Sequence, residues 1–368
     1  MGPMPTISLC MIVRDEEAML PDFLGSVAGC FDQFVAVDTG SRDGTVAILR
    51  GAGAEVHDMV WPDDFAAARN ESLRHATGEW VLVLDADEFP TAGFRHELRA
   101  FVERPGLGAG VILRHDEQKN GIVRTPWTLR LFRSSPDIRY RCRIHEDASD
   151  SIKAMLARRG EAIGRLSTPV RHVGYRAERM DAKDKAARDE RLLRLAVADD
   201  PSDLYSRYKL LELYRFWGNA ASMAPVAAEC RALIERGVPL APAHIAGDLV
   251  EMMRAALYPG EAAAGLAFLT AMAPVAGHTG HYHLAVASLL EDRGSSAAAG
   301  HFARALELAP GDPAQTFIET RALTGLTRLA LAAGDLTGAK RHAGAAFQVA
   351  PDDAEVQLAM QVLAGVPG

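Results

Sequence analysis

The chain has 368 residues, of which 48% are hydrophobic and 24% charged, as in an ordinary globular protein long enough for two domains. Its net charge of −8 argues against a general nucleic-acid binder, which gathers basic residues. The cysteines lie far apart and include no Cys-x-x-Cys pair, so neither a disulfide framework nor a zinc site is expected. The apolar run Ile7–Val13 is too short for a signal peptide, and no run approaches membrane-spanning length. We therefore expect a cytoplasmic protein without a membrane span.

Strand and helix patterns alternate through the first part of the chain. Strands are expected at Ile7–Val13, Asp32–Val37 and Ala54–Val60 and from Trp80 onward, with helices between them at Glu16–Ala28, Val46–Arg50 and Asp64–Ala76. This alternation predicts a parallel sheet covered by helices on both faces. The strands then end at one edge, where open α/β sheets bind their ligands.

Three acids follow the most apolar of these strands. Asp85, Asp87 and Glu88 come directly after the run Trp80–Leu84. If the backbone stays extended, both aspartates lie on one side and Ala86 on the other. Two converging carboxylates are costly unless a cation lies between them or one of them takes up a proton. The pattern therefore favours a metal-diphosphate site, the alternative being an ordinary acidic turn.

Two other residues are candidates for binding a nucleotide. Asp38 ends its strand and opens the Gly-rich stretch Asp38–Thr45, where a carboxylate can accept the imide N–H of a uracil. The plainer interpretation is a turn in which Ser41 or Asp43 caps the next helix, and the two interpretations are compatible. Arg69, within the third helix, can reach a phosphate with its planar guanidinium. Its alternative is an ordinary solvated helix position.

Antiparallel strands are expected between residues 90 and 175. The patterns predict a helix at Gly93–Val102, strands at Val111–Arg114, Leu129–Arg133 and Arg139–Asp147, and a hairpin turn at Asn120-Gly121. Alternation along the third of these strands places Arg139, Arg141, Arg143 and His145 on one face. We expect that basic face to belong to the site, with a solvated face as the alternative. The polar segment Asp150–Gly164 is expected to form a lid or acceptor loop.

Four segments together resemble the family-2 glycosyltransferases of GT-A fold. They are Ile7–Glu16, Val35–Thr45, Ala68–Leu73 and Gly78–Glu88. Within that family, the layout is similar to bacterial enzymes that carry tetratricopeptide-like helices behind the catalytic domain, such as the sublancin-type peptide S-glycosyltransferases. The chain departs from the family at Asp38-Thr39, where a double acid is more usual, and this leaves the choice of nucleotide open.

The resemblance implies a metal-dependent, inverting transfer of a sugar from a nucleotide-sugar donor, with a UDP-sugar preferred. It implies that Asp85 and Asp87, as a DXD motif, hold the metal together with His172. An imidazole beside carboxylates favours Mn²⁺ over Mg²⁺. An acid is implied as the general base, with Glu146 as first choice and Asp147 as second. The donor-binding residues by the same resemblance are Arg14, Asp38, Ser41, Arg69, Asp85 and Arg133.

The sequence pattern predicts that the second half of the chain is all-helical. The predicted architecture is an α/β GT-A (nucleotide-diphospho-sugar transferase) domain at 1–176, followed by an all-α tetratricopeptide-like domain at 177–368. Helices are expected at Asp181–Val197 and Asp203–Phe216. Two later segments match tetratricopeptide spacing, one with Ala298, Phe302, Ala305 and Pro310 and the other with Ala339, Ala343, Ala346 and Pro351. A generic Ala-rich bundle is the alternative.

Helical repeats often bind extended chains, which favours a peptide or protein acceptor. A glycan acceptor and a homodimer through the helices are alternatives. The rival functions are an interaction scaffold with an inactive transferase domain, a nucleotidyltransferase that releases pyrophosphate, and a transferase acting on a polysaccharide or lipid-linked glycan. The scaffold is disfavoured by the intact set of Asp38, Arg69, Asp85, Asp87, Glu146 and His172.

Overall fold

The computed structural model describes residues 4–117, 123–173 and 182–365. Its contacts divide the chain into two compact units, Met1–Leu195 and Ala196–Gly368. The domain border expected at residue 176 lies outside the described residues. Helix α6 (Ala182–Asp199) spans the division between the two units.

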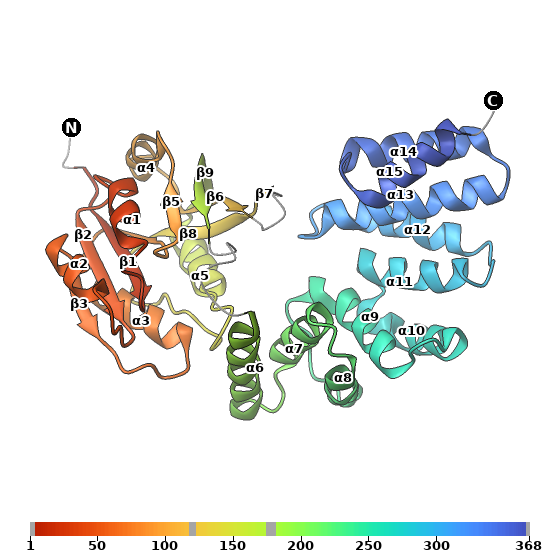
Figure 1. The fold of residues 1–368 in the computed structure, drawn as a ribbon, viewed down its shortest axis with the longest axis horizontal. Coiled ribbons are helices and arrows are strands. Elements are labelled where there is room, and N and C mark those ends of the chain that lie inside the picture. Colours follow the sequence, from red (N-terminus) through yellow and green to blue (C-terminus); the bar gives the residue numbers. More distant parts are fainter. Residues whose placement is uncertain (1–3, 118–122, 174–181, 366–368) are drawn as a thin grey trace. The chain divides into compact units, whose positions relative to one another are not determined.

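The described residues of the first unit form one nine-stranded mixed sheet (Figure 1). Its strands are β1 (Ile7–Val13), β2 (Gln33–Asp38), β3 (Glu55–Asp58), β4 (Trp80–Val83), β5 (Glu88–Pro90), β6 (Leu107–Glu117), β7 (Val123–Arg124), β8 (Trp127–Arg133) and β9 (Ala162–His172). They lie in the order β3-β2-β1-β4-β8-β6-β9-β5, with β7 paired to β6. Strands β1 to β4 run parallel, which confirms the prediction, and β8 lies antiparallel to β4 and β6.

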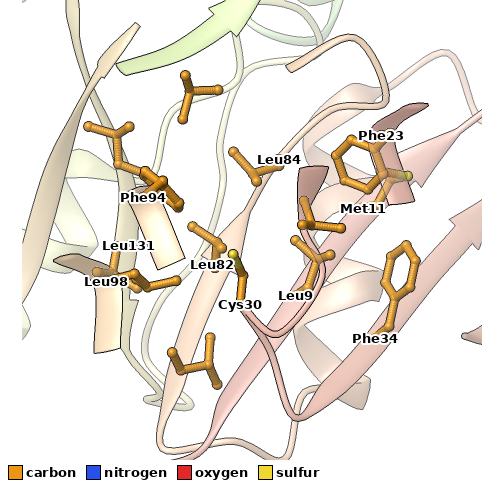
Figure 2. Packing of buried hydrophobic residues seen from close by; sticks show 14 of the residues in the cluster. Leu9, Met11, Phe23, Cys30, Phe34, Leu82, Leu84, Phe94, Leu98 and Leu131 are labelled. Carbon is orange, nitrogen blue, oxygen red and sulfur yellow. The ribbon is translucent and has the colours of Figure 1, made fainter. Parts of the chain in front are cut away.

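Helices pack against both faces of this sheet, as the alternating pattern predicted. They are α1 (Leu20–Ser26), α2 (Thr45–Gly51), α3 (Phe65–His75), α4 (Phe94–Val102) and α5 (Ser149–Arg159). On one face, Leu9 of β1 belongs to a buried cluster with Phe23 of α1 and Phe94 of α4 (Figure 2). On the other face, Cys10 belongs to a second cluster with Met155 of α5. Neighbouring strand residues point to opposite faces, so one strand supplies both cores.

The prediction of a strand over Arg139–Asp147 is wrong. This segment is an irregular loop closed by backbone hydrogen bonds of 2.9 and 3.1 Å between Arg141 and Asp147. Cys142 and His145 have positive φ angles of 71° and 56°. Such left-handed residues interrupt the alternation of a strand, so the predicted basic face does not form.

The expectation of a lid or acceptor loop over Asp150–Gly164 is also wrong. Most of this segment is α5, which ends at Arg159 and is followed by Gly160 with a φ of 65°, and β9 begins at Ala162. The helix buries Ile152, Met155 and Leu156 against the sheet. The hairpin turn expected at Asn120-Gly121 lies outside the described residues, although β6 and β7 on either side of it pair antiparallel.

The described part of the second unit is all helical, as predicted (Figure 1). Its elements are α7 (Leu204–Phe216), α8 (Ala220–Glu235), the 3₁₀ helix η1 (Ala243–Ile245), α9 (Ala246–Leu257), α10 (Ala262–Ala276), α11 (Gly280–Glu291), α12 (Ala298–Leu308), α13 (Gln315–Ala332), α14 (Leu336–Val349) and α15 (Ala354–Ala364). Among the described residues, no helix is both long and apolar enough to cross a lipid bilayer.

The small and aromatic positions of the predicted repeats form the contacts between these helices. Ala298, Phe302 and Ala305 are buried in one cluster with residues of α13. Within α13, Gly325 lies under the Phe302 ring, where an added Cβ would come within 2.4 Å of a ring carbon. Close approach of the two helices therefore depends on the missing side chain at Gly325.

Gly325→Ala is predicted to destabilise the protein by about 1–3 kcal/mol, because overpacking outweighs the better helix propensity of alanine. Gly344→Ala is the matched control, since Gly344 lies within α14 and a Cβ there meets nothing within 4 Å. That change is predicted to stabilise by up to about 1 kcal/mol. Urea unfolding of the full chain measures both effects. Equal effects of the two substitutions would contradict the close packing of α12 on α13.

Candidate active site

The ends of the parallel strands carry several of the predicted donor-site residues. Arg14 follows β1, Asp38 ends β2 and Asp85 follows β4 closely. Since Val13 pairs with Asp38 and β1 also pairs in parallel with β4, these strands end at the same edge of the sheet. The strands therefore end at one edge of the sheet, as the sequence analysis predicted.

A turn follows β4, in place of a continued strand. The backbone N–H of Glu88 donates to the carbonyl of Asp85 at 3.0 Å, and the Glu88 carboxylate accepts from the backbone N–H of Asp85 at 3.1 Å. The chain then enters β5 at Glu88 itself. The Asp85 and Asp87 side chains are therefore placed by a tight turn and take different partners.

The guanidinium of Arg69 lies at the centre of the site, with its side chain only 3% exposed. Its Nη2 donates to Oδ1 of Asp85 at 2.5 Å, and its Nε donates to Oε1 of Glu146 at 3.2 Å. Burial by itself lowers the pKa of Arg69, but the charges of Asp85 and Glu146 outweigh burial and raise it. A permanently charged arginine therefore joins carboxylates from two separate segments. Its Nη1 is buried and has no hydrogen-bond partner in the described part of the chain.

Helix α3 places both Arg69 and the loop that carries Glu146. The carboxylate of Asp64 caps the helix by accepting from the backbone N–H of Ala67 at 2.9 Å. Asn70 donates from Nδ2 to the carbonyl of Tyr140 at 2.9 Å and accepts the Tyr140 backbone N–H at 2.8 Å. These bonds attach the irregular loop to the helix, so Glu146 is held beside Arg69 without regular secondary structure.

Two arginines that sequence analysis did not single out extend this network. Arg130 donates from Nη2 to Oδ2 of Asp85 at 3.1 Å and to Oε1 of Glu88 at 3.0 Å. Arg114 donates to the same Glu88 oxygen at 3.3 Å. Burial by itself raises the pKa of Asp85, but the charges of Arg69 and Arg130 hold it well below its usual range. Asp85 is therefore an anion with both oxygens bound by guanidinium groups.

The structure does not bring Arg133 to this cluster. Arg133 pairs with Trp80 at the start of β4, far along the strand from Asp85, and its guanidinium carbon lies 4.7 Å from the Trp80 ring centre. It also forms an ion pair with Glu161 at 3.3 Å. Arg130 lies toward the opposite end of β8, because that strand runs antiparallel to β4. Arg130 therefore occupies the place that sequence analysis gave to Arg133.

Asp87 and His172 form a separate contact in this region. Oδ2 of Asp87 lies 3.4 Å from Nε2 of His172, and Nδ1 of the same ring lies 3.0 Å from Oδ1 of Asp116. Burial lowers the pKa of His172, but the hydrogen bond and charge of Asp87 outweigh burial and raise it. Both predicted residues thus converge through their side chains.

This pair fits two ligands of a divalent cation, one carboxylate oxygen and one imidazole nitrogen. Within the described ranges, no group of three His, Cys, Asp or Glu side chains forms a metal-binding set. A cation here would take its other ligands from substrate phosphates and water, as Mg²⁺ sites commonly do. Asp85 fits less well as a direct ligand, since guanidinium groups bind both of its oxygens.

The other predicted residues make local contacts. Asp38 is 5% exposed, and its carboxylate accepts from the backbone of Gly40 and Ser41 and from the Ser41 hydroxyl at 2.5 Å. Arg14 lies 3.7 Å from Asp15 and is about half exposed. Asp147 accepts from the Ser149 backbone and hydroxyl at the start of α5. These contacts order turns, so a binding role for Asp38, Ser41 or Arg14 stays a prediction.

Residues 8–163 match the profile of the family described as Glycosyl transferase family 2. The first unit of this chain therefore carries a family 2 glycosyltransferase domain. This confirms the family resemblance and the predicted fold class, a GT-A domain followed by an all-helical region.

Two curated relatives and one solved structure illustrate what the chain is similar to. It is 43% identical over 209 residues to a TPR repeat-containing protein of Synechococcus elongatus, covering 56% of this chain and 52% of the relative. It is 28% identical over 148 residues to the prophage-derived glycosyltransferase SunS of Bacillus subtilis. That match covers 39% of this chain and 35% of the relative. The chain thus spans about half or less of the length of these relatives.

The solved structure is glucosyl-3-phosphoglycerate synthase from Mycobacterium tuberculosis in complex with Mn²⁺, uridine diphosphate and glucosyl-3-phosphoglycerate. Its sequence is 17% identical to this chain. The superposition covers 53% of this chain and 79% of the synthase chain, with a TM-score of 0.39. A TM-score of that size is too low to transfer any property of the complex to this chain.

Replacing Arg69 by methionine is predicted to destabilise the protein by about 3 kcal/mol near neutral pH, because two partly buried carboxylates lose their shared cation. Arg74→Met on the same helix is the control. Arg74 is 73% exposed and pairs only with Glu71 among the described residues, so its loss should change stability by no more than about 0.5 kcal/mol.

The difference between wild type and Arg69→Met should also shrink as pH falls from about 7.5 to about 5. In the wild type, the lowered pKa of Asp85 keeps its stabilisation intact until pH falls below the unfolded value of about 3.9. In the variant, Asp85 keeps only Arg130 as a cationic partner and takes up a proton more readily, so acid restores part of the stability. Urea unfolding at both pH values tests this, and a constant difference would contradict the assigned pairing.

Proposed function

We propose that the protein transfers a sugar, with inversion at the anomeric carbon, from a nucleotide-sugar donor to an acceptor, and that it needs a divalent cation. The observation that carries the proposal is the meeting of four segments at one sheet edge. Arg69 from α3 joins Asp85 after β4 to Glu146 of the loop, while Asp87 meets His172 of β9. The family 2 match over residues 8–163 supports the same reaction class.

The donor diphosphate is proposed to bind beside Asp87 and His172. When bound there, a divalent cation such as Mn²⁺ supplies positive charge to the leaving diphosphate. Asp85 then serves to hold Arg69 and Arg130 in place, because its oxygens already bind both guanidinium groups. A UDP-sugar remains the preferred donor.

Glu146 is proposed as the general base. Its Oε1 accepts from Arg69, and its Oε2 has no hydrogen-bond partner among the described residues, so Oε2 can accept the acceptor's proton. As the nucleophile bonds to the anomeric carbon, the bond from that carbon to the diphosphate oxygen breaks, and its electron pair leaves with the nucleoside diphosphate. Asp147 is the weaker choice, because Ser149 binds both of its oxygens.

The helical domain is proposed to select the acceptor, with a peptide or protein preferred. Exposed aromatic residues at the end of α7 support a binding surface there: Phe216 is 79% and Trp217 43% exposed, and their rings stack edge to face at 5.1 Å. Such exposed apolar groups suit an extended chain better than a free sugar. In this proposal, residues 1–176 carry out the sugar transfer and the helical domain binds the acceptor.

Asp87→Asn is predicted to abolish donor turnover and to weaken Mn²⁺ binding, because an amide is a poorer ligand than a carboxylate. Release of nucleoside diphosphate from a panel of nucleotide-sugars, with and without Mn²⁺, is the measurement. Asp85→Asn is the matched comparison and should lower stability as well as turnover, since Asp85 pairs with two arginines. Turnover of Asp87→Asn at the wild-type rate in EDTA would overturn the metal role. Release of pyrophosphate would instead indicate a nucleotidyltransferase.

Glu146→Gln is predicted to lower sugar transfer by about 10²–10⁴-fold, the usual contribution of a general base, while donor affinity stays unchanged. Glutamine keeps the size of the side chain and an oxygen for Arg69 but cannot accept the proton. Asp147→Asn is the adjacent control and should transfer at close to the wild-type rate. The assignment moves to Asp147 if the two variants behave in the reverse way.

Replacing both Phe216 and Trp217 by serine is predicted to reduce transfer to a peptide acceptor while hydrolysis of the donor by water continues. Phe347→Ser is the control, since Phe347 is also exposed, at 37%, but lies on α14. Both reactions are measured in one assay by following nucleoside diphosphate and glycosylated product. Equal loss of hydrolysis and transfer, or no loss of either, would count against this role of the helices.

A further inference from the structure

We infer that Asp116 is a positioning residue that holds the His172 ring so that Nε2 faces Asp87 and the cation site. This inference rests on the proposed function, because it gives His172 the metal role. Asp116 does not touch the substrate in this account. It acts through the imidazole, from a strand that sequence analysis did not connect with the site.

The register of three strands brings these side chains together. Strand β9 pairs in parallel with β6, where His172 is opposite Asp116, and antiparallel with β5, where His172 is opposite Glu88. Residues that are directly opposite in neighbouring strands have their side chains on the same face of the sheet. His172 is therefore flanked by a carboxylate on each neighbouring strand.

The ring lies between two acids, and each acid faces a different nitrogen. Nδ1 is 3.0 Å from Oδ1 of Asp116, and Nε2 is 3.4 Å from Oδ2 of Asp87. A carboxylate at Nδ1 favours the tautomer that has its proton there, and in that tautomer the lone pair lies on Nε2, the nitrogen that faces Asp87. The side chains of His172 and Asp116 are 15% and 9% exposed, so water competes little for Nδ1.

Asp116 is itself fixed by Arg114, two residues earlier on the same face of β6. Nε of Arg114 donates to Oδ1 at 2.6 Å and Nη2 donates to Oδ2 at 3.0 Å, a bidentate pair. Arg114 also binds Glu88 at 3.3 Å, which connects Asp116 to the Asp85 network. With both oxygens held by a guanidinium, Asp116 is suited to orient the ring and poorly placed to bind a cation directly.

The first test reads the tautomer in the metal-free full-length chain. Protein labelled with ¹⁵N-histidine is studied by NMR at about pH 9, to favour the neutral ring. The His172 signal is identified by its loss in His172→Gln. The inference predicts a proton on Nδ1 in the wild type and a shift toward the Nε2–H tautomer in Asp116→Asn. An Nε2–H tautomer in the wild type would overturn the inference, even if the proposed function holds.

The second test measures Mn²⁺ affinity by the electron paramagnetic resonance signal of the free ion, in the presence of uridine diphosphate. Asp116→Asn should weaken binding by about 10–100-fold, the usual effect of losing a partner that orients a ligand. Glu117→Gln is the control, because Glu117 is the next residue on β6 and pairs with Arg171 at 2.8 Å. Its Mn²⁺ affinity should equal that of the wild type.

A double-mutant cycle separates orientation from a general structural effect. If Asp116 acts through the ring, Asp116→Asn should add no further loss of Mn²⁺ affinity in the His172→Gln background. An equal loss in both backgrounds would overturn the inference while leaving the proposed function intact. A wild-type chain that binds no Mn²⁺ under these conditions would overturn the metal role, and the inference with it. Circular dichroism of each variant verifies that it is folded.

Discussion

The buried guanidinium of Arg69 is the interaction on which the site depends. Asp85 and Glu146 belong to segments far apart in the sequence, and two carboxylates this close would repel each other without a cation between them. Arg69 provides that cation from a rigid helix, which is capped by Asp64 and attached to the loop by Asn70. The proposed base is therefore placed by an ion pair rather than by strand geometry.

From this centre, contacts between acidic and basic side chains continue across the sheet. In order, the chain of contacts runs through Glu146, Arg69, Asp85, Arg130, Glu88, Arg114, Asp116, His172 and Asp87. Burying any one of these charges alone would be costly, and each is offset by its neighbours. The network joins the proposed base at one end to the proposed cation ligands at the other. A substitution in the middle should therefore disturb both ends.

Local patterns were sufficient to predict the parallel core and the strand-end acids. Alternating strand and helix signals identified β1 to β4, and the small positions around Phe302 identified the helix packing of the second unit. The choice between Arg130 and Arg133 depended on the direction of β8, which is a property of pairing between distant segments. Neither the positive φ of Cys142 nor that of His145 follows from residue type, so the loop was mistaken for a strand. Asp116 was missed because its significance comes from strand register alone.

The most direct test of the central claim is a crystal structure of the full chain with uridine diphosphate and Mn²⁺. The account predicts that Oδ2 of Asp87 and Nε2 of His172 coordinate the ion together with the diphosphate, while Arg69 still joins Asp85 to Glu146. An ion coordinated by Asp85 with Arg69 displaced, or a nucleotide bound away from this edge of the sheet, would contradict it.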